Sequence, residues 1–110
     1  MLTETYNITA QSAPPATTLT DLFTVPALTQ AVLSSVIVCN RGVTATTFRI
    51  SLAPAGAADA TSQYLYYDVP IAKNNTFIAT IGITLATTDK VRIYAGNANL
   101  TFTLLGTKIT

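Results

Sequence analysis

Three closely spaced tyrosines are the side chains in this sequence best suited to chemistry or recognition. Tyr64, Tyr66 and Tyr67 lie in one strand-like run, and Asp68 follows them directly. Aromatic rings beside polar groups can stack on a sugar ring or anchor a protein interface. Strand alternation predicts that Tyr64 and Tyr66 share a face and that Tyr67 takes the other. We interpret these three tyrosines, together with Tyr6 near the N-terminus, as residues that pack in the core or bind a protein partner. We favour this interpretation over a sugar site.

Acid–base, nucleophilic and metal chemistry have few residues to draw on. The sequence has no histidine, one cysteine and five acidic residues, and the acids fall mostly in predicted turns or at strand ends. Cys39 ends an apolar run and is interpreted as a small buried hydrophobic residue. A nucleophilic pair needs a base, and a zinc-type metal site needs several ligands. We therefore expect no catalytic residues, no metal ligands, no cofactor and no enzymatic activity.

Charge and hydropathy exclude further classes of partner. The chain has 110 residues with six basic and five acidic side chains, for a net charge of +1. The basic residues are mostly far apart, which argues against the basic patch that nucleic-acid binding requires. No apolar run is long enough to span a membrane, and the N-terminus lacks the basic and apolar regions of a secretion signal. We expect no nucleic acid, no membrane, and synthesis in the cytoplasm.

The elements that must position these residues are short β-strands. Strand-like runs with alternating or continuous apolar residues are separated by turn signals at the spacing typical of a sandwich or barrel. The run 31–39 is apolar on both faces and predicts a strand that is covered on both sides. Gly96 and Asn97 suggest a tight hairpin. The predicted strands cover residues 17–25, 31–39, 46–52, 63–69, 76–85, 91–95 and 99–105.

These runs predict an all-β fold, a single antiparallel β-sandwich of about seven to eight strands in a jelly-roll-like order. Residues 1–16 are predicted to be an extended N-terminal arm, because Pro14 and Pro15 disfavour a central strand and residues 7–12 show no sustained period. Such an arm either extends freely or lies on another subunit. Residues 17–110 are the predicted sandwich domain.

Threonine and alanine dominate the composition, with 21 and 16 copies. Threonine is β-branched and suits a pleated surface. A sheet surface covered with threonine instead of lysine and glutamate costs little to desolvate and repels little. This composition is expected of a domain that packs against neighbouring subunits.

Several segments together resemble small virion proteins of tailed bacteriophages, which are β-sandwich subunits described as capsid decoration (cement), tail or fibre-associated proteins. The similarity covers about residues 22–106 and rests on five segments. These are residues 23–27 (FTVPA), 34–42 (SSVIVCNRG), 48–56 (FRISLAPAG), 64–68 (YLYYD) and 82–85 (GITL).

The resemblance implies a non-enzymatic structural protein of the virion, made in the host cytoplasm. The leading hypothesis is a capsid decoration protein that binds the outer surface of the head and stabilises it. Its partners would be the major capsid protein and further copies of itself, most simply in a homotrimer. One alternative is a tail, baseplate or head-fibre subunit. The other is a carbohydrate-binding module for host attachment, which the tyrosine cluster suggests.

Overall fold

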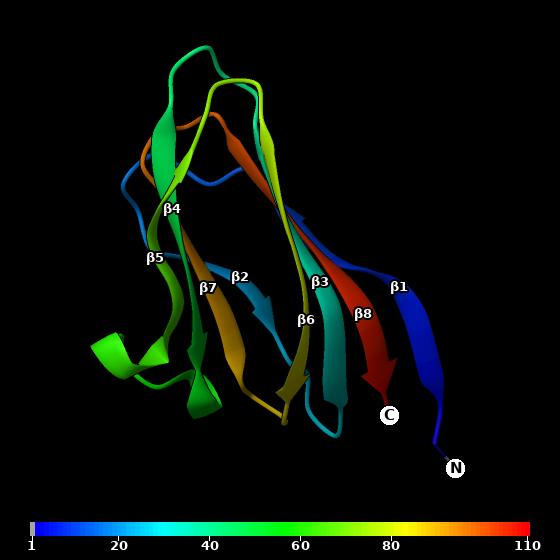
Figure 1. Ribbon diagram of the computed structural model, residues 1–110. Helices are drawn as coiled ribbons and strands as arrows, with labels where there is room; N and C mark the ends of the chain where they lie inside the picture. Colours follow the sequence, from blue (N-terminus) through cyan, green and yellow to red (C-terminus); the bar gives the residue numbers. More distant parts are fainter. Residues whose placement is uncertain (1) are drawn as a thin grey trace.

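The protein is described by a computed structural model (Figure 1), which covers residues 2–110. Met1, part of the predicted arm, lies outside the described residues. The described chain folds into two four-stranded antiparallel sheets that pack face to face, in the orders β1-β8-β3-β6 and β2-β7-β4-β5. The strands are β1 (Glu4–Ser12), β2 (Thr20–Thr24), β3 (Gln30–Asn40), β4 (Thr46–Ala53), β5 (Tyr64–Ile71), β6 (Thr76–Leu85), β7 (Lys90–Ala95) and β8 (Leu100–Ile109).

The strand order is that of a jelly roll, and it confirms the predicted fold class. Only β4 and β5 are consecutive in sequence and adjacent in a sheet, and every other connection crosses from one sheet to the other. Such crossings are the mark of paired Greek keys. They also show that the expected hairpin at Gly96 and Asn97 is wrong. Because β7 and β8 belong to different sheets, that turn bridges the sandwich.

The prediction of an extended N-terminal arm is wrong for residues 4–12. They do not form a free arm but pair along β8 as an edge strand, with Tyr6 opposite Thr107 and Gln11 opposite Thr103. The sequence shows no clear apolar alternation here, because most of β1 is exposed and Ala10 alone of its hydrophobic residues packs against the core. Pro14 and Pro15 lie after this strand, where the chain leaves the sheet, so they do not prevent residues 4–12 from pairing.

The core fills the space between the sheets with side chains that alternate along nearly every strand. The predicted inward sets on β4, β6 and β8 face it, including the fully buried Phe48 and Phe102. The Phe48 ring lies 5.0 Å from Phe77 and 6.2 Å from Phe102, measured between ring centroids. Because Phe48 belongs to one sheet and the other two rings to the opposite sheet, these contacts join the layers. Burying each large apolar side chain contributes about 1.5–3 kcal/mol.

Asn40 is a buried polar residue, 1% exposed, at the end of the sandwich where β3 finishes. Its Nδ2 group donates to the carbonyl oxygens of Thr44 at 3.0 Å and Ala72 at 3.2 Å. Its Oδ1 atom accepts from the backbone N–H of Gly42 at 2.9 Å. The side chain therefore ties β3 to the loop 41–45 and to the connection between β5 and β6.

We predict that Asn40→Ala lowers the free energy of unfolding by about 2–3 kcal/mol, because buried backbone groups lose their hydrogen-bond partners. Thermal unfolding should show a fall in Tm of roughly 8 °C or more. Asn7→Ala, at an exposed position of β1, is the matched control and should change stability by less than about 0.5 kcal/mol. Equal effects of the two substitutions would contradict this role for Asn40.

Candidate interaction surfaces

The tyrosines of β5 are positioned by a break in strand pairing. Opposite β4, Val69 pairs with Phe48 and Tyr66 with Ile50, so Tyr67 and Asp68 together face the single residue Arg49. This is a β-bulge, and Asp68 has a φ of 51°. The extra residue reverses the alternation beyond it, which a count of positions in the sequence cannot anticipate.

A second shift in register follows, because Ile50 pairs with Tyr66 and Ser51 with Tyr64, so Leu65 has no partner on β4. This shift puts Tyr64 on the side of Tyr67, and the prediction that Tyr64 and Tyr66 share a face is wrong. The rings of Tyr64 and Tyr67 meet edge to face with centroids 5.1 Å apart. Tyr66 packs against the core, 5.3 Å from Phe77. Tyr67 is 56% exposed and is the β5 tyrosine most available to a partner.

Arg49 completes this cluster, although it is not among the residues predicted to bind a partner. Its guanidinium carbon lies 4.1 Å from the ring centroid of Tyr67 and 4.5 Å from that of Tyr94. Its Nε atom donates to Asp68 Oδ1 at 2.6 Å, and this hydrogen bond raises the pKa of Arg49 above its usual range. In the sequence, Thr47, Arg49 and Ser51 occupy every second position of β4. This spacing places Arg49 on the outer face of the strand.

A second ion-pair cluster lies on the same sheet. Asp21 of β2 accepts from Lys90 Nζ at 2.7 Å and from Arg92 Nε at 3.1 Å. Hydrogen bonding to Lys90, and then to Arg92, holds the pKa of the Asp21 carboxyl below its usual value although partial burial opposes this shift. Arg92 also donates to the carbonyl oxygens of Gly56 and Ala57, which ties the loop between β4 and β5 to the sheet.

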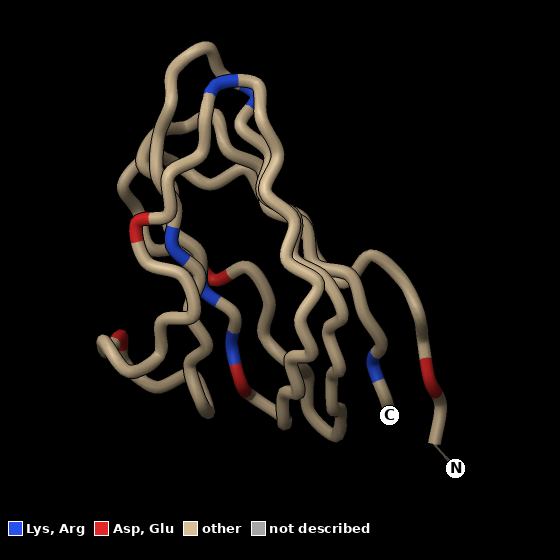
Figure 2. The backbone as a smooth tube through the Cα atoms, viewed as in Figure 1, with Lys and Arg blue, Asp and Glu red and all other residues tan. Residues whose placement is uncertain are grey.

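These two clusters determine the charge balance on the outer face of the sheet β2-β7-β4-β5. Its cations face carboxylates or tyrosine rings, so its charges are largely neutralised within the face. Figure 2 shows these alternating positive and negative positions along the left-hand strands. One side of the Tyr67 ring is already covered by Arg49. The arrangement stabilises the sheet and offers no free acid–base pair.

Tyr6 lies on the other sheet and is not brought together with the β5 tyrosines. It is 73% exposed, and its hydroxyl donates to Glu4 Oε2 at 2.5 Å. This hydrogen bond raises the pKa of Tyr6 above its usual value. The four predicted partner-binding residues therefore lie on two surfaces, and their role stays a prediction.

The outer face of the sheet β1-β8-β3-β6 is nearly free of charge. Directly opposed residues share a face of a sheet, so the strand register defines which side chains lie here. We call this surface the neutral face. Its three complete rows are Tyr6, Thr107, Val32 and Thr84; Ile8, Leu105, Ser35 and Thr80; and Gln11, Thr103, Ile37 and Ile78.

Cys39 lies at the end of this face, beside Thr101 and Thr76. It is a free cysteine and is half-buried rather than fully buried. The interpretation of Cys39 as a buried residue is therefore only partly right. The reason is that β3 presents its second apolar side to the outer surface.

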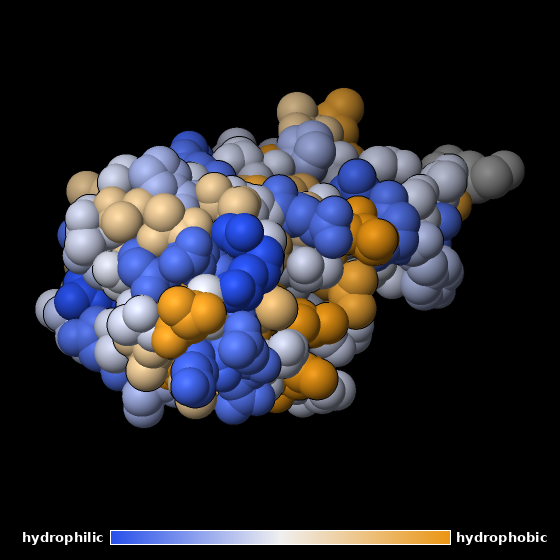
Figure 3. All heavy atoms as spheres, turned by 90° about the horizontal axis from the view of Figure 1, so that it is seen from above, coloured by the Kyte–Doolittle hydropathy of each residue, from blue (hydrophilic) through white to orange (hydrophobic). Residues whose placement is uncertain are grey.

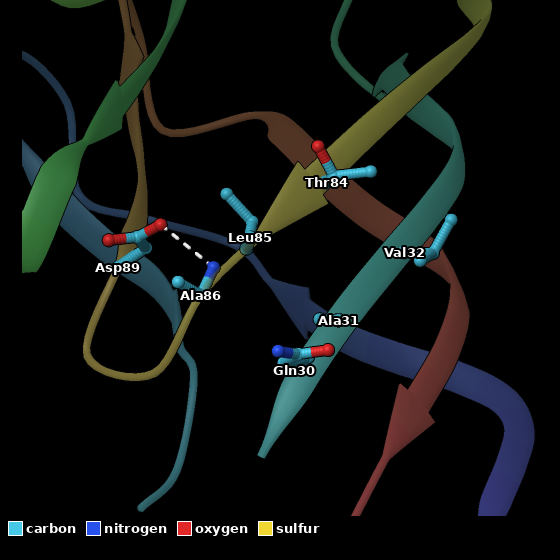
Figure 4. A pocket seen from close by; sticks show the side chains of 7 residues that line it. All are labelled: Gln30, Ala31, Val32, Thr84, Leu85, Ala86 and Asp89. Atoms are coloured by element: carbon cyan, nitrogen blue, oxygen red, sulfur yellow. Dashed lines mark hydrogen bonds between the residues drawn. The ribbon is translucent and has the colours of Figure 1, made fainter. Parts of the chain in front are cut away.

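Two shallow hollows border the neutral face, and neither has catalytic character. One, of about 380 Å³, lies where β3 and β6 end, and Figure 4 shows Val32 and Thr84 beside it. The carboxylate of Asp89 in this hollow already accepts from the backbone N–H groups of Ala86 at 2.9 Å and Ala55 at 2.8 Å. The other hollow is lined only by uncharged residues, Gln11, Ser12, Ala13, Thr101 and Thr103.

The loop end of the sandwich has a different surface. It is formed by the loops around residues 41–45, 72–75 and 96–99. Seen from this end in Figure 3, hydrophobic residues form small patches separated by hydrophilic ones. Val43 is 80% exposed here. In this view the loop end therefore has no single extended hydrophobic patch.

Within residues 2–110 no three histidine, cysteine or acidic side chains gather where they could hold a metal ion. No helix among the same residues has the length and apolar character needed to cross a membrane.

Comparison with solved structures finds the same fold in a virus. Over 99% of its length the chain superimposes on a chain of the infectious bursal disease virus Gx strain, with a TM-score of 0.57 and 9% identity. A chain of the T13 particle of that virus matches with a TM-score of 0.53 and 8% identity, again over 99% of this chain. This chain spans about a third of the length of those chains, 32% and 30%. At these identities the likeness shows a shared fold. No protein-family model matches the chain, and no curated protein matches it.

Substitution of the two neighbouring tyrosines should separate core packing from surface exposure. Tyr66→Ala removes a ring that contacts Phe48 and Phe77 and should destabilise the protein by about 2–3 kcal/mol, somewhat less than for a fully buried ring. Tyr67→Ala removes a mostly exposed ring and should cost less than about 1 kcal/mol, the loss of its contact with Arg49 included. Urea unfolding measures both values. A larger loss for Tyr67→Ala would contradict the assigned bulge.

The ion pairs of Asp21 predict a pH dependence. Because the pKa of the Asp21 carboxyl is lowered in the folded state, its contribution is present above the unfolded value of about 3.8 and is lost as the pH falls through the folded value. Asp21 is 46% exposed, so solvent screening limits the contribution to about 0.5–1 kcal/mol. Asp21→Asn should therefore be less stable than the wild type at neutral pH and equally stable in strong acid. A difference that persists in strong acid, or is unchanged by high salt, would count against an ionic origin.

Proposed function

We propose that the protein is a non-enzymatic structural subunit of a virion, and specifically a decoration protein on the outer surface of a bacteriophage head. The observation that carries this proposal is the jelly-roll topology of nearly the whole chain, which is shared with chains of an icosahedral virus particle. The resemblance of five sequence segments to small phage virion proteins supports the same role.

The surface chemistry supports a structural role. The chain carries only eleven charged residues, six basic and five acidic, and five of them are engaged in ion pairs on one sheet. A surface with so few free charges loses little hydration when it is covered by neighbouring subunits. That property suits a protein that functions in many copies on an ordered shell.

A head offers the same binding position many times. A decoration protein that contacts several major capsid subunits at once, or does so as a trimer of its own copies about a three-fold axis, gains affinity from multivalency. Binding of this kind holds neighbouring capsid subunits together against the pressure of packaged DNA. The protein would be made in the host cytoplasm and would then reside in the virion.

The test is binding of labelled protein to heads and to tails, each purified from the phage that encodes the chain but lacking the protein. We expect saturable sedimentation with heads, and we expect decorated heads to release their DNA at a higher temperature than bare heads. Sedimentation with tails alone would overturn decoration in favour of a tail or baseplate subunit. Binding to neither particle would remove the virion role.

A further inference from the structure

The two sheets differ in how well their edge strands are protected against further pairing. The edges of the sheet β2-β7-β4-β5 are protected, since β2 has only five residues and β5 contains Pro70. The edges of the other sheet are β1 and β6, with nine and ten residues, no proline and one charge, Glu4, and each has one shift in register against its neighbour. Long uncharged edges are unusual in a protein that remains alone, because they invite further pairing.

The two sides of strand β3 also differ, because only one of them is covered by the rest of the chain. Its sequence is apolar on both sides, which predicts cover on both sides. Within one chain only the inner side is covered, where Leu33, Val36 and Val38 are fully or almost fully buried. On the outer side Val32 remains 41% exposed. The second cover that the sequence predicts must come from outside the chain.

Four of the ten exposed large hydrophobic residues of the described chain share this one face: Tyr6 at 73%, Ile8 at 57%, Val32 at 41% and Ile78 at 63% exposed. The other six lie elsewhere, in loops, near the N-terminus or on β5. The remainder of the neutral face is mainly threonine, serine, glutamine and half-buried aliphatic side chains, with Glu4 at its end. Figure 2 shows β3 and β6 without a charged position along their length.

The neutral face is comparable in size to one side of a standard interface. Four strands at about 4.8 Å spacing give a width of about 19 Å, and ten residues give a length of about 33 Å. The flat area is therefore about 600 Å², before the relief of the side chains is added. A standard interface buries about 800 Å² on each partner.

We infer that the neutral face is the surface through which copies of this chain associate, its occupant being a second copy of the chain. The face is electrically complementary to itself. Its one carboxylate, Glu4, lies at the first position of the edge strand β1, so the middle of the face meets a second copy without like charges opposed. A strongly charged partner would gain nothing here, because the face offers no free cation and no second anion.

This inference rests on the proposed function for the need for repeated copies, but it is tested on the isolated protein. Light scattering and native mass spectrometry over a wide range of concentration should show a dimer of the full chain, because a face that meets its own copy closes as a two-fold pair. Ile78→Asp and Val32→Asp each place a carboxylate in the middle of the face. Each should weaken association by about a hundredfold or more, because a charge must be desolvated without a partner.

Val43→Asp is the matched control, since Val43 is 80% exposed but lies in the loop after β3 and away from the neutral face. It should leave the mass of the oligomer unchanged. Thermal unfolding checks that all three variants are folded. Cys39, at the end of the face, should react with a thiol reagent more slowly in the wild type than in Ile78→Asp.

A monomer at every concentration, or an oligomer that Ile78→Asp and Val43→Asp affect equally, would overturn the inference. These outcomes are distinct from failure of the proposed function. A monomer that still sediments with heads would refute self-association and leave decoration intact. An oligomer that binds no particle would support the interface and refute the decoration role.

Discussion

The structure depends on the packing of four aromatic rings across the space between the two sheets. Phe48, fully buried on β4, contacts Phe77 and Phe102 of the opposite sheet, and Tyr66 closes the cluster from β5. In a jelly roll, consecutive strands mostly belong to different layers, so few local contacts hold the chain. The two layers are joined chiefly by side chains that meet in the core. Because the inner faces of both sheets form the shared core, the side chains of the two outer faces can differ in charge.

The outer faces do differ, and electrostatics accounts for the difference. One sheet carries Arg49, Arg92 and Lys90 with the carboxylates that neutralise them. The outer face of the other sheet carries aliphatic and threonine side chains and a single carboxylate, and Lys108 of β8 lies on the opposite side, paired with the buried Ala31. A chain with so few charges cannot cover both faces with ionic groups. Concentrating them on one sheet leaves a second surface whose desolvation costs little, and that surface gives the molecule its capacity to associate.

Much of the fold follows from alternation in the sequence. The strands that became β2 to β8 are visible because apolar residues recur at every second position or, in β3, continuously. The first strand was missed because both its faces are largely exposed, so no buried face imposes a period on residues 4–12. The grouping of Tyr64 with Tyr67 was missed because the two register shifts of β5 appear only in its pairing with β4, and the sequence of β5 alone does not reveal them. The second exposed side of β3 could be found only when the structure showed how many layers the chain itself provides.

Electron cryomicroscopy of the particle that contains this chain tests the account most directly. The account predicts density for several copies of the jelly roll on the outer surface of the head, with the β1-β8-β3-β6 face of each copy covered by a neighbouring copy. Density that shows this face open to solvent, or copies of the chain located on the tail and none on the head, would contradict it.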